Sequence, residues 1–188
     1  MAQTDRERWD PRYADASHKL RRGPHPFLTR HAPPAVAGSR ALELACGLGR
    51  DALWLAAQGY TVEALDISVG ALRLARTEML RRGLHGVNFI AADLDVFPLP
   101  RHAYDLVCVF RFLDRRLFPA IRDCVRPGGV VIYETLNVRR LDESPETSPE
   151  RMLELDELPG HFPGWTVLET GSEGSSSYFA GRKPLDPC

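Results

Sequence analysis

The sequence predicts a single α/β domain in which a mostly parallel β-sheet carries helices on both faces. Short apolar runs alternate with amphipathic stretches along most of the 188 residues, which is typical of consecutive β-α units. The apolar run before Cys46 ends in a glycine-containing turn, and a helix start follows it. The run Asp105–Phe110 is almost continuously apolar, as expected of a central parallel strand that is buried on both faces.

Strands and helices alternate over the first half of the chain. Residues 1–38 are predicted to form an N-terminal extension or lid, built from a helix and a proline-rich hinge, ahead of a domain over residues 39–188. Strands are expected at Arg40–Ala45, Thr61–Asp66 and Val87–Ala91. The helices between them are expected at Arg50–Gln58 and Val69–Arg82, where Ser68 suits the N-cap and glycines follow both ends.

The second half begins with the same pattern and then changes. After the strand Asp105–Phe110, we expect a helix over Leu117–Val125, stopped by Pro127-Gly128, and a strand over Val130–Thr135. The polar stretch Leu136–Pro149 indicates an exposed loop, and Arg151–Leu158 a short helix. Two strand-like runs, Trp165–Thr170 and Ser176–Gly181, are joined by glycines and serines, which predicts a terminal antiparallel hairpin.

Composition limits the classes of partner and compartment. A formal net charge of −1 provides no field that would recruit nucleic acid or a membrane surface. The four cysteines show no C-x-x-C spacing and no accompanying histidine cluster, so no metal site is expected. We find no signal peptide and no apolar run of membrane length, and therefore expect a cytoplasmic protein.

Acidic residues follow the first three strands, where a nucleotide would bind. Gly47 and Gly49 allow a ligand to approach the backbone closely, and the next helix offers free N–H groups. Asp66, at the end of the second strand, suits a contact to ribose hydroxyls, and Asp93, after the third, can accept from an adenine amino group. Ligands of open α/β sheets bind at these carboxyl ends, but a dinucleotide would satisfy the glycines and Asp66 equally well.

Glu43 discriminates between the two nucleotide classes. A carboxylate in the apolar run Ala41–Ala45 is expected to be largely buried and to need donors or a positive partner. It would repel a pyrophosphate, whereas it complements the ammonium and sulfonium groups of S-adenosylmethionine (SAM). The alternative is that Glu43 only satisfies loop N–H groups or a helix N-terminus.

Together these residues resemble the class I SAM-dependent methyltransferases. The match includes Glu43-x-Ala45-Cys46-Gly47-x-Gly49, Asp66, Asp93 and Arg126-Pro127-Gly128-Gly129, in the family's order over roughly residues 40–183. It implies a Rossmann-like, seven-stranded, mostly parallel sheet whose last strand inserts antiparallel between the fifth and sixth. Trp9-Asp10-x-x-Tyr13 and Phe112–Pro119 further resemble the small bacterial methyltransferases of the tellurite-resistance and thiopurine type.

The resemblance and the residue patterns together yield a set of expected SAM-contacting residues. These are Glu43, Ala45, Cys46, Gly47, Gly49, Arg50, Asp66, Ile67, Asp93, Leu94 and Phe110. Relatives often carry Asn where this chain has Asp51, which favours the helix N-terminus but leaves the ligand contact there open.

The acceptor side is less defined by the sequence. Arg111 and Arg115 lie just before a helix start, where cations oppose the helix dipole, so we consider them for an anionic substrate. The alternative is that they are solvated surface arginines. Tyr13 can close over SAM or the acceptor or make only a packing contact, and His25 is a candidate proton acceptor. No catalytic acid or base is assigned, because an activated methyl group needs mainly alignment.

The predicted function is in-line methyl transfer from SAM to a small molecule. The alternatives are a non-catalytic module that binds SAM or a nucleotide and, less favoured, an NAD-dependent oxidoreductase. The expected partner is a small methyl acceptor rather than nucleic acid or a membrane, and the chain is expected to be a monomer or homodimer.

Overall fold

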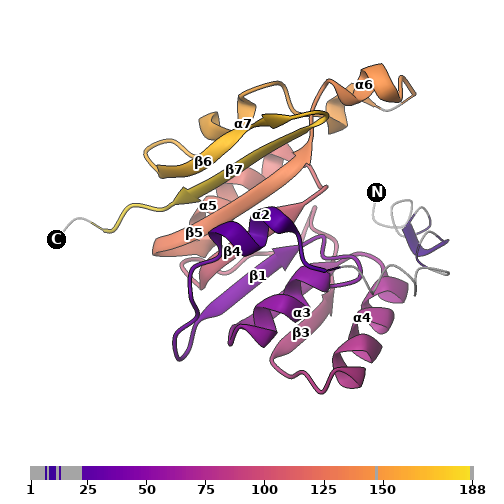
Figure 1. Cartoon of the computed structure of the whole chain (residues 1–188), viewed down its shortest axis with the longest axis vertical. Helices are drawn as coiled ribbons and strands as arrows, with labels where there is room; N and C mark the ends of the chain where they lie inside the picture. Colours follow the sequence, from indigo (N-terminus) through magenta and orange to yellow (C-terminus); the bar gives the residue numbers. More distant parts are fainter. Residues whose placement is uncertain (1–6, 8, 12, 14–22, 147, 187–188) are drawn as a thin grey trace. The chain divides into compact units, whose positions relative to one another are not determined.

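The computed structural model describes residues 7, 9–11, 13, 23–146 and 148–186 (Figure 1). Two compact units are present, residues 1–30 with 34–98 and residues 31–33 with 99–188. The predicted division into an extension (1–38) and a domain (39–188) stays a prediction.

The first unit is a parallel β-α-β-α-β arrangement. Strands β1 (Arg40–Leu44), β2 (Thr61–Asp66) and β3 (Val87–Ala91) pair in parallel. Helices α3 (Arg50–Ala57) and α4 (Val69–Arg81) connect the strands and pack on them, and α2 (Pro26–His31) precedes β1 (Figure 1). The expected strands and helices from residue 40 to 91 are confirmed to within one residue at each end.

Local sequence explains these boundaries. Ser68 caps α4, because its Oγ accepts a hydrogen bond from the Ala71 amide at 3.1 Å. Gly59 follows α3 with a φ of 99°, a conformation that favours glycine. Leu42 and Leu44 of β1 and Leu53 of α3 have no exposed surface, which fixes how the helix packs on the strands.

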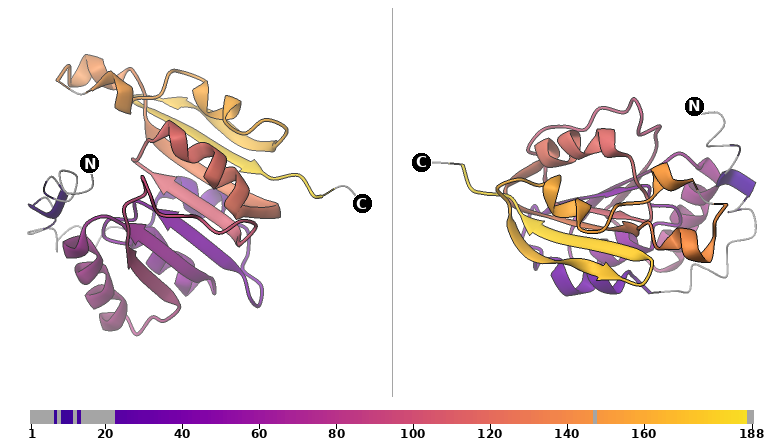
Figure 2. Two further views of the ribbon diagram at one scale, coloured as in Figure 1. Left: turned by 180° about the vertical axis from the view of Figure 1, so that it is seen from behind. Right: turned by 90° about the horizontal axis from the view of Figure 1, so that it is seen from above.

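The second unit contains β4 (Tyr104–Phe110), β5 (Val125–Leu136), β6 (Thr166–Glu173) and β7 (Ser176–Arg182). Strand β5 pairs in parallel with β4, and β7 runs antiparallel between β5 and β6, so the predicted terminal hairpin is confirmed (Figure 2). Five short helices complete the described part of this unit: η2 (Arg115–Leu117), α5 (Phe118–Cys124), α6 (Arg140–Glu143), η3 (Pro149–Arg151) and α7 (Glu157–Gly160).

Across the described residues the strand order is β3-β2-β1-β4-β5-β7-β6, a seven-stranded mixed sheet with helices. This confirms the predicted α/β class, the Rossmann-like topology and the insertion of the last strand next to β5. None of the helices in the described ranges has both the length and the apolar character needed to cross a membrane.

Two expected elements are corrected by the structure. Strand β5 begins at Val125 rather than Val130 and runs through Pro127-Gly128. Two backbone hydrogen bonds join this segment to Lys183, the residue directly after β7: the Gly128 amide donates to the Lys183 carbonyl at 3.1 Å, and the Lys183 amide donates to the Gly129 carbonyl at 2.8 Å. The single helix expected over residues 151–158 is replaced by η3 and α7, and the expected loop before it contains α6.

Candidate functional site

The turn between β1 and α3 has a backbone that side-chain-bearing residues rarely adopt. Ala45, Gly47 and Gly49 have φ values of 53°, 53° and 62°. A Cβ at Gly47 would lie 2.8 Å from the Tyr13 hydroxyl, and one at Gly49 only 2.7 Å from Cε1 of Phe89. Cys46 lies between Ala45 and Gly47 and is buried. This turn, the glycine cradle, is therefore closely packed: Tyr13 and Phe89 occupy the space that a side chain at Gly47 or Gly49 would need.

Asp66 at the end of β2 is tied to this turn. Its Oδ2 accepts a hydrogen bond from the Gly47 amide at 2.6 Å, and its Oδ1 accepts from the Ser68 amide at 2.8 Å. The neighbouring Ile67 amide also interacts with the carboxylate. Asp66 is 6% exposed, and burial raises its pKa above the ordinary value. Each oxygen retains a lone pair for a further donor, such as a ribose hydroxyl.

Glu43 lies one residue before the end of β1 and is 3% exposed. Its Oε2 accepts a hydrogen bond from the Ala52 amide at 2.7 Å, the contact with a helix N-terminus that the alternative interpretation expected. Burial, followed by the negative charge of Asp51, raises the pKa of Glu43 well above its usual value. Because Oε1 has no hydrogen-bond donor among the described residues, a cationic ligand would offset the cost of the buried charge.

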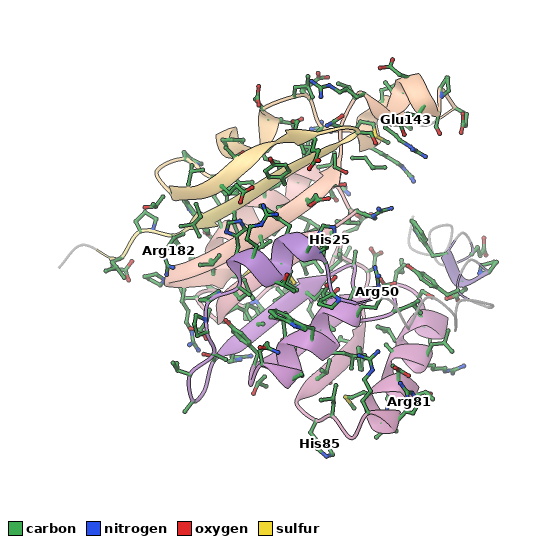
Figure 3. All side chains as sticks on the ribbon, in the orientation of Figure 1. His25, Arg50, Arg81, His85, Glu143 and Arg182 are labelled. Carbon is green, nitrogen blue, oxygen red and sulfur yellow. The ribbon has the colours of Figure 1, made fainter. Side chains whose placement is uncertain are left out.

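Asp51, which the sequence left open, is a second buried acid at the start of α3. Its Oδ1 accepts from the His25 amide at 2.6 Å, and burial raises its pKa. His25 and Arg50 thus lie at the same end of α3 (Figure 3). The His25 ring caps α2 instead of standing alone, because its Nδ1 accepts from the Phe27 amide at 3.4 Å. The Arg50 guanidinium has no hydrogen-bond acceptor among the described residues, which suits it to an anionic group such as the SAM carboxylate.

Asp93 lies in a turn directly after β3. Its Oδ1 accepts from the Asp95 amide at 3.0 Å, so one oxygen is used locally and the other remains for a ligand. Leu94 beside it is buried and supplies an apolar surface. Asp93, Asp66 and Glu43 therefore mark the carboxyl ends of three adjacent parallel strands, as the sequence predicted.

Tyr13 contacts the glycine turn from outside the sheet. Its ring packs against Leu48 and Ala71 and stacks on Trp9, with ring centroids 6.2 Å apart. The adjoining Asp10 accepts a hydrogen bond from the Ser68 hydroxyl. Sequence reasoning identified Tyr13 as a site candidate but gave Asp10 no role of its own; Asp10 entered only as part of the motif Trp9-Asp10-x-x-Tyr13.

On the second unit, Phe110 ends β4 and Arg111 follows in the left-handed region, with a φ of 57°. The Arg111 amide donates to the Glu134 carbonyl at 2.8 Å, which holds this backbone in place beside β5. A positive φ at an arginine is strained, and such strain concentrates at functional sites. The Arg111 side chain is exposed.

Arg115 is engaged within the protein. Its guanidinium donates to both Glu157 carboxylate oxygens at 2.7 and 2.8 Å and to the carbonyls of Glu150 and Met152, each at 2.8 Å. This network attaches residues 150–157 to η2, and His161 Nε2 lies 2.9 Å from the same Glu157. Arg115 therefore acts here as a structural clamp, and Arg111 is the one of the two whose side chain makes no hydrogen bond or ion pair with the described residues.

Comparison with known proteins places this geometry in context. Residues 41–129 match the family model described as "Methyltransferase domain". The ubiquinone biosynthesis O-methyltransferase of Chromobacterium violaceum is 31% identical over 116 residues, which is 59% of this chain and 49% of that protein. The chain spans about half the length of the curated relatives it matches.

Two solved structures share the fold. The S-adenosylmethionine dependent methyltransferase from Mesorhizobium loti aligns with a TM-score of 0.69 and 17% identity, over 84% of this chain and 96% of that one. TehB from Haemophilus influenzae aligns with a TM-score of 0.68 and 18% identity, over 79% of this chain and 58% of TehB. At these identities the likeness concerns the arrangement of strands and helices.

Proposed function

We propose that the chain is a class I SAM-dependent methyltransferase that transfers the SAM methyl group to a small molecule, because residues 41–129 match the methyltransferase-domain family model and its curated relatives are methyltransferases. The observation that carries the proposal is the tie between Asp66 and the Gly47 amide, which sets an acid for the ribose against the glycine cradle. Glu43 complements the ammonium and sulfonium groups, and Asp93 accepts from the adenine amino group. Arg50 pairs with the methionine carboxylate, while Ala45, Cys46, Ile67, Leu94 and Phe110 complete the donor site.

The proposed mechanism is an in-line displacement. Bound SAM supplies a methyl group that is already activated by its sulfonium leaving group. The residues of the chain bind and orient the donor and exclude water, and alignment of this kind supplies on the order of 7–11 kcal/mol when the geometry is ideal. Tyr13 lies over the donor turn, and we propose that the segment before residue 38 acts as a lid.

The acceptor is a small molecule in this proposal. The named relative is an O-methyltransferase of ubiquinone biosynthesis, and that supports a small organic acceptor; oxygen, nitrogen, sulfur and metalloid oxyanions remain candidates. We propose a cytoplasmic monomer or homodimer that does not act on nucleic acid, which fits three buried free cysteines and a net charge of −1.

Calorimetry with SAM and NADH, followed by a labelled-SAM screen, tests this function. The proposal expects SAM binding without NADH binding, and methyl transfer to one class among thiols, phenols, small acids and chalcogen oxyanions. SAM binding with no transfer to any class would favour the alternative of a non-catalytic SAM-binding module. NADH binding without SAM binding would overturn the assignment.

Asp66→Asn is expected to raise the dissociation constant for SAM about tenfold, since a hydrogen bond to a charged group contributes about 1.5–3 kcal/mol. Asparagine replaces one of the two accepting oxygens by a donor NH2 group, so it cannot accept from both the Gly47 and the Ser68 amides and the turn loses one of its two ties. Titration calorimetry measures the change. Asp95→Asn, an exposed acid beyond β3 whose backbone amide is used by Asp93, serves as the control and should bind SAM as the wild type does.

Arg111→Gly tests the acceptor side. Glycine adopts the 57° φ without strain, so the fold should be retained, while removal of the guanidinium should raise KM for an anionic acceptor about tenfold. Arg111→Ala should show the same raised KM as Arg111→Gly. Its melting temperature should be lower than that of Arg111→Gly, because alanine keeps the backbone strain that glycine relieves. Equal KM for wild type and both variants would remove Arg111 from the acceptor site.

A further inference from the structure

Two helical residues near the N-terminus contact the two residues whose amides donate hydrogen bonds to Asp66. Asp10 contacts Ser68, and Tyr13 contacts Gly47. Ser68 donates its amide to Asp66 and its hydroxyl to Asp10, so one serine joins the two carboxylates. On the other side, the Gly47 amide donates to Asp66, and the Tyr13 hydroxyl lies over Gly47. Asp10 and Tyr13 thus each contact a residue that is hydrogen-bonded to Asp66, although 53 to 56 residues separate them from it in the sequence.

The contact with Ser68 is well anchored. Ser68 has no exposed surface, and its Oγ also accepts from the Ala71 amide at the start of α4. Its single hydroxyl proton is therefore directed at Asp10 Oδ1. This places the Asp10 carboxylate at a fixed point beside the end of β2, at the N-terminus of α4, where a negative charge is favourable.

Asp10 keeps an unused acceptor in this position. Its Oδ2 has no hydrogen-bond donor among the described residues, and its carboxylate is close enough to contribute, after burial, to the raised pKa of Asp66. Two carboxylates held side by side repel each other when both are ionised. Hydroxyl groups placed between them would offset this repulsion by donating to both.

We propose that Asp10 is a second carboxylate of the ribose edge of the donor site, sharing the two ribose hydroxyls of SAM with Asp66. This inference rests on the proposed function and adds a residue to that site. Residues 9–11 and 13 become part of the donor site, and their position depends on a bound ribose. A ligand with a 2′-phosphate is excluded, because its charge would face two carboxylates.

The test compares Asp10→Asn with the wild type in calorimetric titrations with S-adenosylhomocysteine and with its 2′-deoxy and 3′-deoxy analogues. Asparagine retains an oxygen that accepts from Ser68, so the segment stays docked while the charge is removed. The expected result is a loss of about tenfold for S-adenosylhomocysteine and a clearly smaller loss for at least one deoxy analogue. Glu7→Gln, an exposed acid of the same segment, controls for net charge and should bind all three ligands as the wild type does.

The outcomes separate this inference from the proposed function. Failure of the wild type to bind S-adenosylhomocysteine would contradict the function itself. Tight wild-type binding with no loss in Asp10→Asn overturns only the role of Asp10. An equal loss for all three ligands also overturns it, because Asp10 would then act by docking residues 9–11 and 13 and not through the ribose hydroxyls.

Discussion

Replacement of Glu43 by glutamine is expected to weaken SAM binding about 10- to 100-fold, the range set by one hydrogen bond to a charged group. Glutamine retains an oxygen that accepts from the Ala52 amide, so the start of α3 keeps its partner. The negative charge that complements the ammonium and sulfonium groups is lost. Titration calorimetry with SAM measures the effect directly.

Without bound SAM, Glu43→Gln should become more stable than the wild type as the pH rises. Burial and the charge of Asp51 raise the pKa of Glu43 in the folded state. Such a group stabilises the fold below its unfolded-state pKa, and this contribution is lost as the pH rises through the folded-state pKa. The difference in unfolding free energy, variant minus wild type, should therefore increase above pH 4.5, the ordinary pKa, in urea titrations at stepped pH.

Glu63→Gln provides the matched control. Glu63 lies on the adjacent β2 and pairs with Arg40 at 2.8 Å near the surface, so its loss should leave SAM affinity unchanged to within about twofold. An unchanged SAM affinity in Glu43→Gln as well would mean that Glu43 serves only the N-terminus of α3.

Gly49→Ala is expected to lower the unfolding free energy by about 3 kcal/mol, from a left-handed backbone cost of roughly 1–2 kcal/mol and an overpacking cost of about 1–3 kcal/mol. The added Cβ would lie 2.7 Å from Phe89 Cε1 and 3.3 Å from the Ala75 Cβ. The Phe89 ring is rigid and α4 is packed behind it, so neither neighbour moves cheaply. Chemical denaturation measures the loss.

Gly174→Ala separates the two contributions. Gly174 has a φ of 53°, similar to that of Gly49, but a Cβ there would meet nothing within 4 Å. Only the backbone cost of about 1–2 kcal/mol should appear. Adding Phe89→Leu to Gly49→Ala should recover part of its loss, whereas equal losses in the two glycine variants would show that the contact with Phe89 is unimportant.

Local sequence patterns were sufficient to predict where the helices and strands of the first unit begin and end. The alternation of apolar and polar residues, the Ser68 cap and the glycines after each helix lie within a few residues of the boundaries they set, and those boundaries are confirmed from residue 40 to 91. In the second unit, Pro127-Gly128 predicts the end of a helix when only its neighbours in the sequence are considered. The strand continues through it because Lys183, more than fifty residues away, completes its backbone hydrogen bonds.

In the candidate site, too, some features follow from local sequence and others depend on residues that are distant in the sequence. The acids that end successive parallel strands were predictable, because strand order places them at one edge. The engagement of Arg115 was not, because its partner Glu157 lies 42 residues away and nothing in either segment indicates the pairing. Asp51 and Asp10 are similar cases: their contacts with His25 and Ser68 depend on how the N-terminal residues pack.

The sequence by itself determined the α/β class, the resemblance to SAM-dependent methyltransferases and the residues of the glycine turn, because each follows from side-chain period, backbone freedom or the chemistry of a single acid. Only the tertiary structure decided which of those polar groups are already engaged. Hydrogen-bond partners across long sequence separations depend on packing, and packing fixed Glu43 on α3, Asp66 on Gly47 and Asp10 on Ser68.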